Sequence, residues 1–108
     1  MIARPWRGWT APEDAGRYER LLRTDILPDI AARSGKGARG AEVYRRRDGE
    51  EVASVMGLRF TSTGAVRQFG QFVGDSPREA YVSPTARALL RQFEDKVTHF
   101  EVVVDDHE

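Results

Sequence analysis

Cysteine is absent from the sequence, which excludes disulfides, thiolate-bound metal ions and a thiol nucleophile. Long apolar runs are absent as well, since no stretch approaches the roughly 20 residues of a membrane-spanning helix. No apolar signal-peptide core follows Met1, so we expect a cytoplasmic protein outside the membrane. A charge surplus is also missing, because 17 Lys and Arg residues balance 17 Asp and Glu residues. Binding to nucleic acid through bulk positive charge is therefore not expected.

The composition that remains is that of one folded domain. The 108 residues match the size of a single domain, which we place at residues 1–108. Apolar residues make up 40% and charged residues 31% of the chain, as in a globular protein and unlike a disordered one.

The first third of the chain predicts a strand followed by a helix. Residues 2–9 have the pattern of a strand, although Pro5 suits only an edge or a bulge. Thr10 is the expected N-cap of the helix, with Glu13 completing a capping box. Pro28 should distort or end this helix. One apolar stripe runs along it: Ala15, Tyr18, Leu22, Ile26 and Ile30.

The middle of the chain predicts a hairpin and a second helix. The glycine-rich residues 34–40 are expected to form a connection. Strands at residues 41–46 and 51–61 flank Asp48-Gly49, which is a strong hairpin signal. Ser62 or Thr63 can cap the helix that follows. The inward-facing positions of this helix are Val66, Phe69, Phe72 and Val73.

The last third predicts another helical segment and a final strand. Ser83-Pro84 combines an N-cap with a first-turn proline, and the helix it starts contains Leu89, Leu90 and Phe93. The valine-rich residues 97–104 form the last strand. The resulting order, βαββαβ, is that of a ferredoxin-like α+β fold, in which helices cover one face of an antiparallel sheet.

The predicted strands at residues 51–61 and 97–104 are apolar on both faces. A sheet with one face in water alternates apolar and polar residues, and these strands do not. Because helices cover only one face of such a sheet, a second layer must cover the other. We therefore expect a homodimer in which two sheets pack face to face, as in a dimeric α/β barrel.

Several short segments, spread over nearly the whole chain, form a recognisable set. They are Met1-Ile-Ala-Arg-Pro-Trp-Arg-Gly8, Arg45-Arg-Arg-Asp-Gly49, Phe60-Thr-Ser62, Ala80-Tyr-Val-Ser-Pro84 and Val97-Thr-His-Phe-Glu-Val102. Together they resemble the antibiotic biosynthesis monooxygenase (ABM) family of small dimeric α/β-barrel proteins. The resemblance implies a ferredoxin-like fold and a homodimer.

The resemblance also implies a range of activities. Relatives include cofactor-independent monooxygenases of polyphenols and quinols, as well as haem-degrading enzymes. The haem-degrading relatives carry an asparagine in the first strand and a histidine ligand in the second helical region. Here residues 2–9 contain no asparagine and residues 62–96 contain no histidine, so haem degradation is not expected.

A cofactor-free oxygenase acting on a phenolic, quinol or polyketide-like substrate would use a small set of side chains. His99 is the candidate base, because its unperturbed pKa lies near neutrality. Tyr81 is the second catalytic candidate and orients a ring oxygen together with Trp6. Arg4 lies on the same strand face as Trp6 and can stabilise negative charge. The candidate apolar walls of the substrate pocket are Phe60, Phe69 and Phe72.

Each polar candidate also has a structural interpretation. His99 and Glu101 share a strand face and can form an interfacial ion pair, and Arg4 can form a salt bridge across the dimer. No metal or other cofactor is expected, because His99 and His107 would lie roughly 26 Å apart on one extended strand. The alternative function is a non-catalytic homodimer that binds a small ligand or has a stress or metabolic role.

Overall fold

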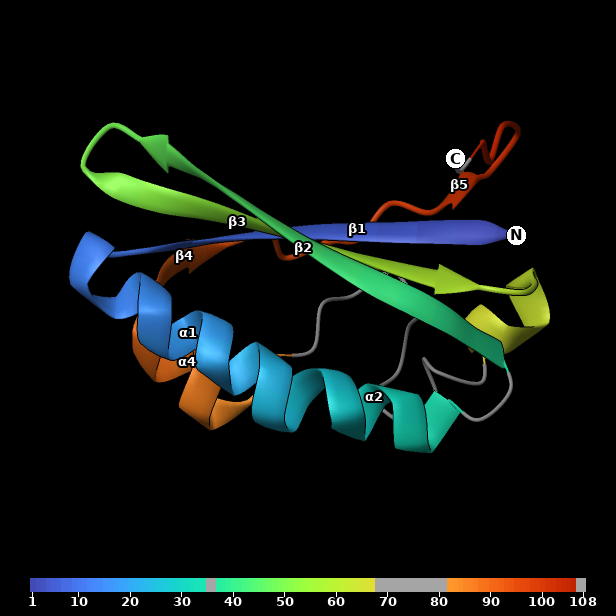
Figure 1. Cartoon of the computed structure of the whole chain (residues 1–108), viewed down its shortest axis with the longest axis horizontal. Coiled ribbons are helices and arrows are strands. Elements are labelled where there is room, and N and C mark those ends of the chain that lie inside the picture. The colour runs from blue at the N-terminus through green and yellow to red at the C-terminus, as the bar shows by residue number, and fades with distance from the viewer. Residues whose placement is uncertain (35–36, 68–81, 107–108) are drawn as a thin grey trace.

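The computed structural model describes residues 1–34, 37–67 and 82–106, with the side chains of residues 33 and 34 left out of the description. An antiparallel sheet forms one layer and helices pack against one of its faces (Figure 1). The predicted α+β class is confirmed, and the arrangement is compatible with a ferredoxin-like fold. In the described part of the chain, no helix has the length and apolarity needed to span a membrane.

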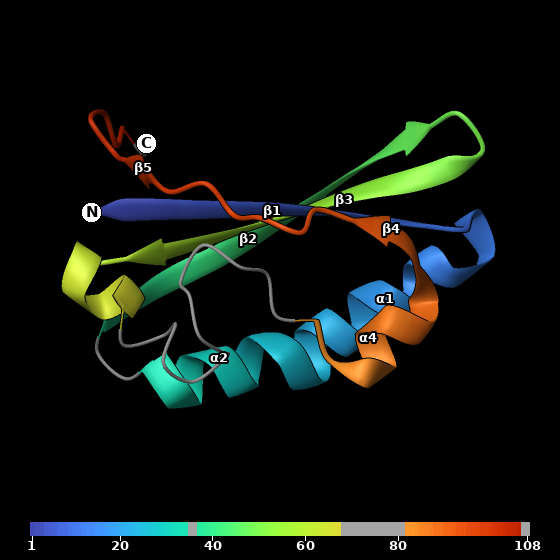
Figure 2. The same ribbon diagram turned by 180° about the vertical axis from the view of Figure 1, so that it is seen from behind.

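The sheet contains two long pairings and two short ones. Its strands are β1 (Ile2–Thr10), β2 (Ala38–Asp48), β3 (Glu51–Phe60), β4 (Leu90–Phe93) and β5 (Phe100–Glu101). The order is β2-β3-β1-β4, and β5 also pairs with β1. Seen from behind, β4 and β5 lie one after the other along β1 (Figure 2). Together β4 and β5 take the place of the single last strand that the sequence predicts.

The predicted boundaries near the end of the chain are wrong. Helix α4 (Pro84–Leu89) stops before Leu90, whose backbone is already extended, and Leu90 and Phe93 lie in β4 instead of the helix. Of the strand predicted at residues 97–104, only β5 is formed. Apolar residues three apart fit a helix and not a regular strand. In β4 a register shift between Trp9 and Thr10 leaves Arg91 as an extra residue between Leu90 and Phe93. Pairing with Gly8 and Thr10 decides for the strand here.

Pro5 lies in the part of β1 between the residues that pair with β4 and those that pair with β5. The β4 pairing covers Gly8–Thr10 and the β5 pairing covers Ile2 and Ala3. A proline has no N–H to donate to a neighbouring strand, so it is tolerated where a ladder is interrupted. The expectation that Pro5 suits an edge-like position agrees with this arrangement.

The first helical region begins differently from the prediction. Thr10 belongs to β1 and is 1% exposed, so it is not the N-cap. The 3-10 turn η1 (Pro12–Asp14) starts after Ala11, which makes no side-chain cap, and α1 (Ala15–Leu21) follows it. Pairing with Val52 keeps Thr10 in the strand.

Pro28 distorts this region without ending it. A π-helical turn, η2 (Leu22–Ile26), follows α1, and α2 (Leu27–Ser34) continues beyond the proline. Within this turn the Leu27 N–H donates to the Leu22 carbonyl, five residues back. The extra residue per turn places Leu27 beside Ile26 on the buried side, and both pack against the core.

The apolar stripe and the local turn signals are confirmed. Tyr18 and Leu22 are each 2% exposed, and Gly49 has the positive φ of 63° that the hairpin turn requires. Ser62 and Ser83 act as N-caps, since their Oγ atoms accept the backbone N–H of Ala65 and Ala86 at 3.2 Å. Residues 63–67 are helical and Val66 is buried. The inward positions Phe69, Phe72 and Val73 lie outside the described residues.

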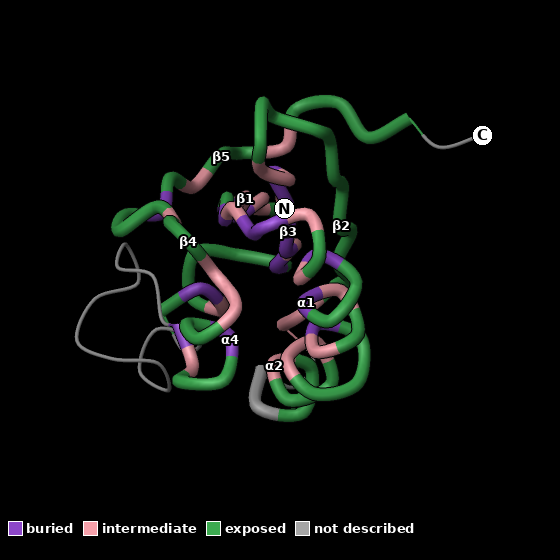
Figure 3. The backbone as a smooth tube through the Cα atoms, turned by 90° about the vertical axis from the view of Figure 1, so that its left-hand side faces the viewer, coloured by how far each residue is buried: buried purple, intermediate pink, exposed green. Residues whose placement is uncertain are grey.

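The two faces of the sheet differ in how they are covered. The inner face, toward the helices, carries buried side chains: Arg4, Trp6, Met56, Leu58 and Phe60. The outer face carries the alternate residues of the same strands, among them Pro5, Tyr44, Val55, Gly57 and Phe100. Strand β2, the edge of the sheet, is exposed along nearly its whole length, as is the chain after β5 (Figure 3).

Candidate functional site

An apolar pocket of about 280 Å³ opens between α2 and the β2–β3 hairpin on the inner face. The described residues that line it are Leu27, Ile30 and Ala31 from α2, Ala38, Gly40 and Ala41 from β2, and Leu58, Arg59 and Phe60 from β3. Pockets for drug-sized ligands span about 300–1,000 Å³, so this one suits a small molecule. The space exists because β2 presents only small residues where α2 presents Leu27 and Ile30.

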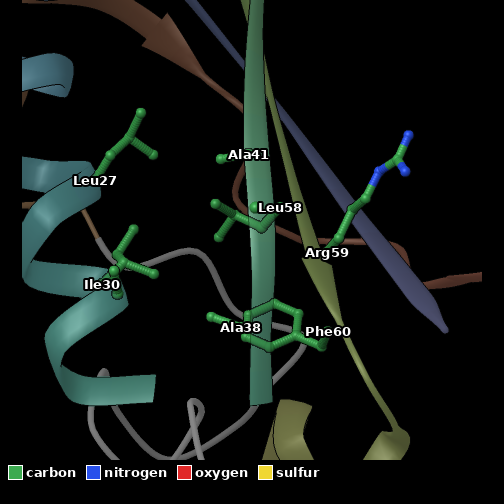
Figure 4. A pocket seen from close by; sticks show the side chains of 9 residues that line it. Leu27, Ile30, Ala38, Ala41, Leu58, Arg59 and Phe60 are labelled. Atoms are coloured by element: carbon green, nitrogen blue, oxygen red, sulfur yellow. The ribbon is translucent and has the colours of Figure 1, made fainter. Parts of the chain in front are cut away.

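The side chains around the pocket come from two opposite walls (Figure 4). Leu27 and Ile30 project from α2 toward the strands, and Leu58 projects from β3 toward the helix. The Arg59 side chain points to the other side of the sheet. There its guanidinium lies 3.4 Å from Asp105 and 4.0 Å from Glu42. The described walls are therefore apolar, apart from backbone groups.

Phe60 is the predicted substrate-binding residue that the structure places at this pocket. It is fully buried, it ends β3, and it pairs with Ile2 on one side and Ala38 on the other. Its ring therefore connects the pocket with the hydrophobic core around Leu58 and Val66.

Trp6 lies deeper in the core, under β4. Its ring is 6% exposed and packs at 6.0 Å from the Phe93 ring, tilted by 41°. The indole N–H donates to the Glu94 carbonyl at 2.7 Å. A backbone acceptor thus satisfies this polar tip without a ligand, and Trp6 is not among the described residues that line the pocket.

Arg4 shares the inner face with Trp6, as the sequence predicts. It is 4% exposed and pairs with Leu58, one of the pocket residues. Burial lowers the pKa of Arg4 to about 10, because desolvation disfavours the charged guanidinium. Arg4 therefore lies beside the core on the inner face. A salt bridge through the outer face would not involve it.

His99 lies in the segment between β4 and β5, not in a strand. It is half-buried, its Nε2 atom is shielded from solvent, and it directly precedes Phe100, which pairs with Ala3. Glu101 is in β5 and exposed. The expectation that His99 and Glu101 share the face of one continuous strand is therefore wrong, because β5 begins only after His99. His99 is not among the described residues of the pocket.

The other predicted site residues are not placed by the structure. Tyr81, Phe69 and Phe72 lie outside the described residues, as does His107. Their roles stay predictions. Among the described residues, no group of three or more His, Cys, Asp or Glu side chains could hold a metal ion.

Sequence reasoning missed most of the pocket wall. Leu27 follows the predicted stripe by one position, and it packs against the core directly after the π-helical turn. Ala38, Gly40 and Ala41 were assigned in part to a connection, and small residues give no apolar signal of their own. The shortage of large side chains in a strand beside an apolar helix is the pattern that could have indicated a cavity.

Comparison with known proteins finds likeness in structure and not in sequence. No protein-family model matches the chain, and no curated protein matches it in sequence. The chain is similar to Rv0793 from Mycobacterium tuberculosis, with 24% identity, 98% of each chain covered and a TM-score of 0.58. It is also similar to a conserved protein from Methanosarcina mazei Go1, with 17% identity, 92% of this chain and 89% of that chain covered, and a TM-score of 0.60. At these identities the likeness shows a shared compact α/β fold.

Proposed function

We propose that this protein is an ABM-like homodimer that binds a small aromatic molecule in the pocket between α2 and the β2–β3 hairpin. The observation that carries the proposal is the apolar pocket of about 280 Å³ with Phe60 in its wall. Its small volume and the absence of charged groups among its described inward-facing side chains favour a phenol, a quinol or a polyketide-like ring over a nucleotide or a sugar.

The outer face supports the homodimer. Near the hairpin end, the outer face is closed by the chain's own side chains, since the Trp9 indole donates to Asp48 at 3.0 Å across β3. In the middle of the face Pro5 pairs with Gly57 beside Val55, and these three residues are half-buried in the described part of the chain. These small and apolar residues support packing of this face on an identical one about a two-fold axis.

Cofactor-free oxygenation is the reaction that the ABM resemblance suggests for such a ligand. Conversion of an anthrone CH₂ to a carbonyl consumes O₂ and releases water, and the substrate itself supplies all the electrons. The protein must exclude water, hold the ring and accept a proton. Apolar walls serve the first two tasks. Arg4 is the residue predicted to stabilise charge that develops on the substrate, and His99 is the predicted base; neither is among the described residues that line the pocket.

Two measurements on the purified protein separate binding from catalysis. Calorimetry with phenols and anthrones tests binding, with Ala41→Phe as the variant that fills the pocket and Ala32→Phe, on the exposed side of α2, as its control. Oxygen consumption with the same compounds tests turnover in the wild type and in His99→Ala. Binding that only Ala41→Phe abolishes supports the proposed site. Binding without oxygen consumption leaves the non-catalytic alternative, and no binding by any compound refutes the proposal.

A further inference from the structure

The strand that forms one wall of the pocket is irregular where it meets the pocket. In the β2–β3 pairing, Ala38 lies opposite Phe60 and Ala41 opposite Leu58. Two residues of β2, Arg39 and Gly40, therefore stand against Arg59 alone. This is a β-bulge, in which one extra residue is inserted into one strand of an antiparallel pair.

The bulge determines which residues face α2. In a regular strand, residues three apart point to opposite faces of the sheet. Because of the extra residue, both Ala38 and Ala41 face the helix, and both line the pocket. The bulge thus supplies the small side chains that leave the cavity open.

The bulge also brings backbone polar groups to an otherwise apolar wall. A bulge interrupts the ladder of hydrogen bonds, so backbone N–H and C=O groups of the extra residue are left for other partners. Gly40 lines the pocket and has a φ of 110°. Residues with a Cβ atom rarely adopt this backbone conformation. A Cβ placed on Gly40 would meet no atom within 4 Å, so the space in front of this backbone is open.

Charge selects strongly among the ligands that fit such a site. The one charged residue among the described pocket residues is Arg59, and its side chain points away toward Glu42 and Asp105. Arg4 lies on the same inner face behind Leu58 and is not among the described lining residues, so a carboxylate or sulfonate entering the pocket would lose its hydration without touching a positive side chain of the described lining. That desolvation costs several kcal/mol, whereas a neutral hydroxyl needs only one or two hydrogen bonds.

We infer that the pocket selects neutral, singly hydroxylated aromatic rings, whose hydroxyl bonds to the backbone of the Arg39–Gly40 bulge. This inference rests on the proposed function, because it names the form of the aromatic ligand that the same pocket takes. The bulge acts as the polar end of the site, and the apolar walls of α2 and β3 hold the ring.

The test compares three probes of similar ring size in the full-length protein. Titration calorimetry measures the Kd of 1-naphthol, 1-naphthoate and naphthalene at neutral pH. We expect 1-naphthol to bind at least about tenfold more tightly than each of the others. In Gly40→Ala the bulge is strained, and the preference for naphthol over naphthalene should fall toward one. Gly16→Ala, at an exposed helix position with no atom near the new Cβ, is the matched control and should keep the preference.

The outcomes distinguish this inference from the proposed function. Equal or tighter binding of 1-naphthoate refutes the charge selection and leaves the pocket as an aromatic site. A naphthol preference that survives in Gly40→Ala, with the circular dichroism spectrum of the wild type, refutes the role of the bulge. If no probe binds, the proposed function itself is refuted.

Discussion

The inner and outer faces of the sheet are built by the same strands, yet their side chains are buried to very different extents. On the inner face, Phe60 and Leu58 of β3 are 0% and 3% exposed. On the outer face, Val55 and Gly57 of β3 are half-buried, and Tyr44 of β2 and Phe100 of β5 are 56% and 54% exposed. The inner face of β3 carries the larger apolar side chains, and its outer face carries Ala53, Val55 and Gly57 between Glu51 and Arg59. The described helices pack on the inner face (Figure 1). The inner face holds the core and the pocket, and the outer face is the one we propose to pack against a second copy.

The largest loss of stability is expected when a large side chain on the inner face is truncated. Phe60→Ala leaves a cavity in the core and should lower the free energy of unfolding by about 3–5 kcal/mol. The same truncation on the outer face, Phe100→Ala, should cost much less in the folded protomer. Urea denaturation of both variants measures the two values. Equal losses would contradict the different roles of the two faces.

Burial on the inner side also makes stability depend on pH. Desolvation raises the pKa of Tyr18 to about 12, from an ordinary value of 10. Between these two values the unfolded chain releases the phenol proton and the folded chain keeps it, so stability falls as pH rises from about 10 to 12. A shift of two pKa units lowers the free energy of unfolding by about 2–3 kcal/mol at the upper end of this pH range.

Replacement of Tyr18 isolates this contribution. In Tyr18→Phe the loss of stability between pH 10 and 12 should be smaller by that amount than in the wild type. Denaturation at a series of alkaline pH values gives the comparison. An unchanged slope in Tyr18→Phe would show that this phenol ionises as easily in the folded chain as in the unfolded one.

A charge on the outer face tests the dimer. A Cβ on Gly57 would meet only the Glu42 carbonyl oxygen, at an ordinary 3.9 Å, so the protomer has room for a side chain there. Gly57→Arg should therefore fold, but weaken the dimer by at least about tenfold in Kd, because an arginine would be forced into an apolar interface. Gly16→Arg introduces the same charge at an exposed helix position and should stay dimeric. Sedimentation equilibrium that shows a monomeric wild type at micromolar concentration would refute the proposed homodimer.

The sequence predicts well those features that local chemistry decides. The Asp48-Gly49 hairpin, the Ser83 cap and the stripe through Tyr18 and Leu22 all depend on neighbouring residues, and each is present. Where pairing partners far along the chain decide, the prediction fails. Thr10 is held in β1 by Val52, and residues 90–93 become a strand because β1 is available to pair with them.

The candidate site was predictable only in part. Phe60 is predicted as an apolar wall of the substrate pocket, and it is among the described residues that line the pocket. The pocket beside it depends on a π-helical turn that brings Leu27 inward and on a bulge that turns both Ala38 and Ala41 toward the helix. Both are insertions of a single residue into a regular element. They arise from the packing of the whole chain, so residue spacing gives no sign of them.

The most direct test of this division of tasks is a map of ligand contacts on the two faces. Backbone amide chemical shifts of the labelled protein, recorded with increasing 1-naphthol, report which residues the ligand approaches. The account predicts that the largest changes fall on Leu27, Ile30, Gly40 and Ala41, while Val55 and Gly57 on the outer face stay unchanged. Changes concentrated at Val55 and Gly57, with none around α2, would contradict it.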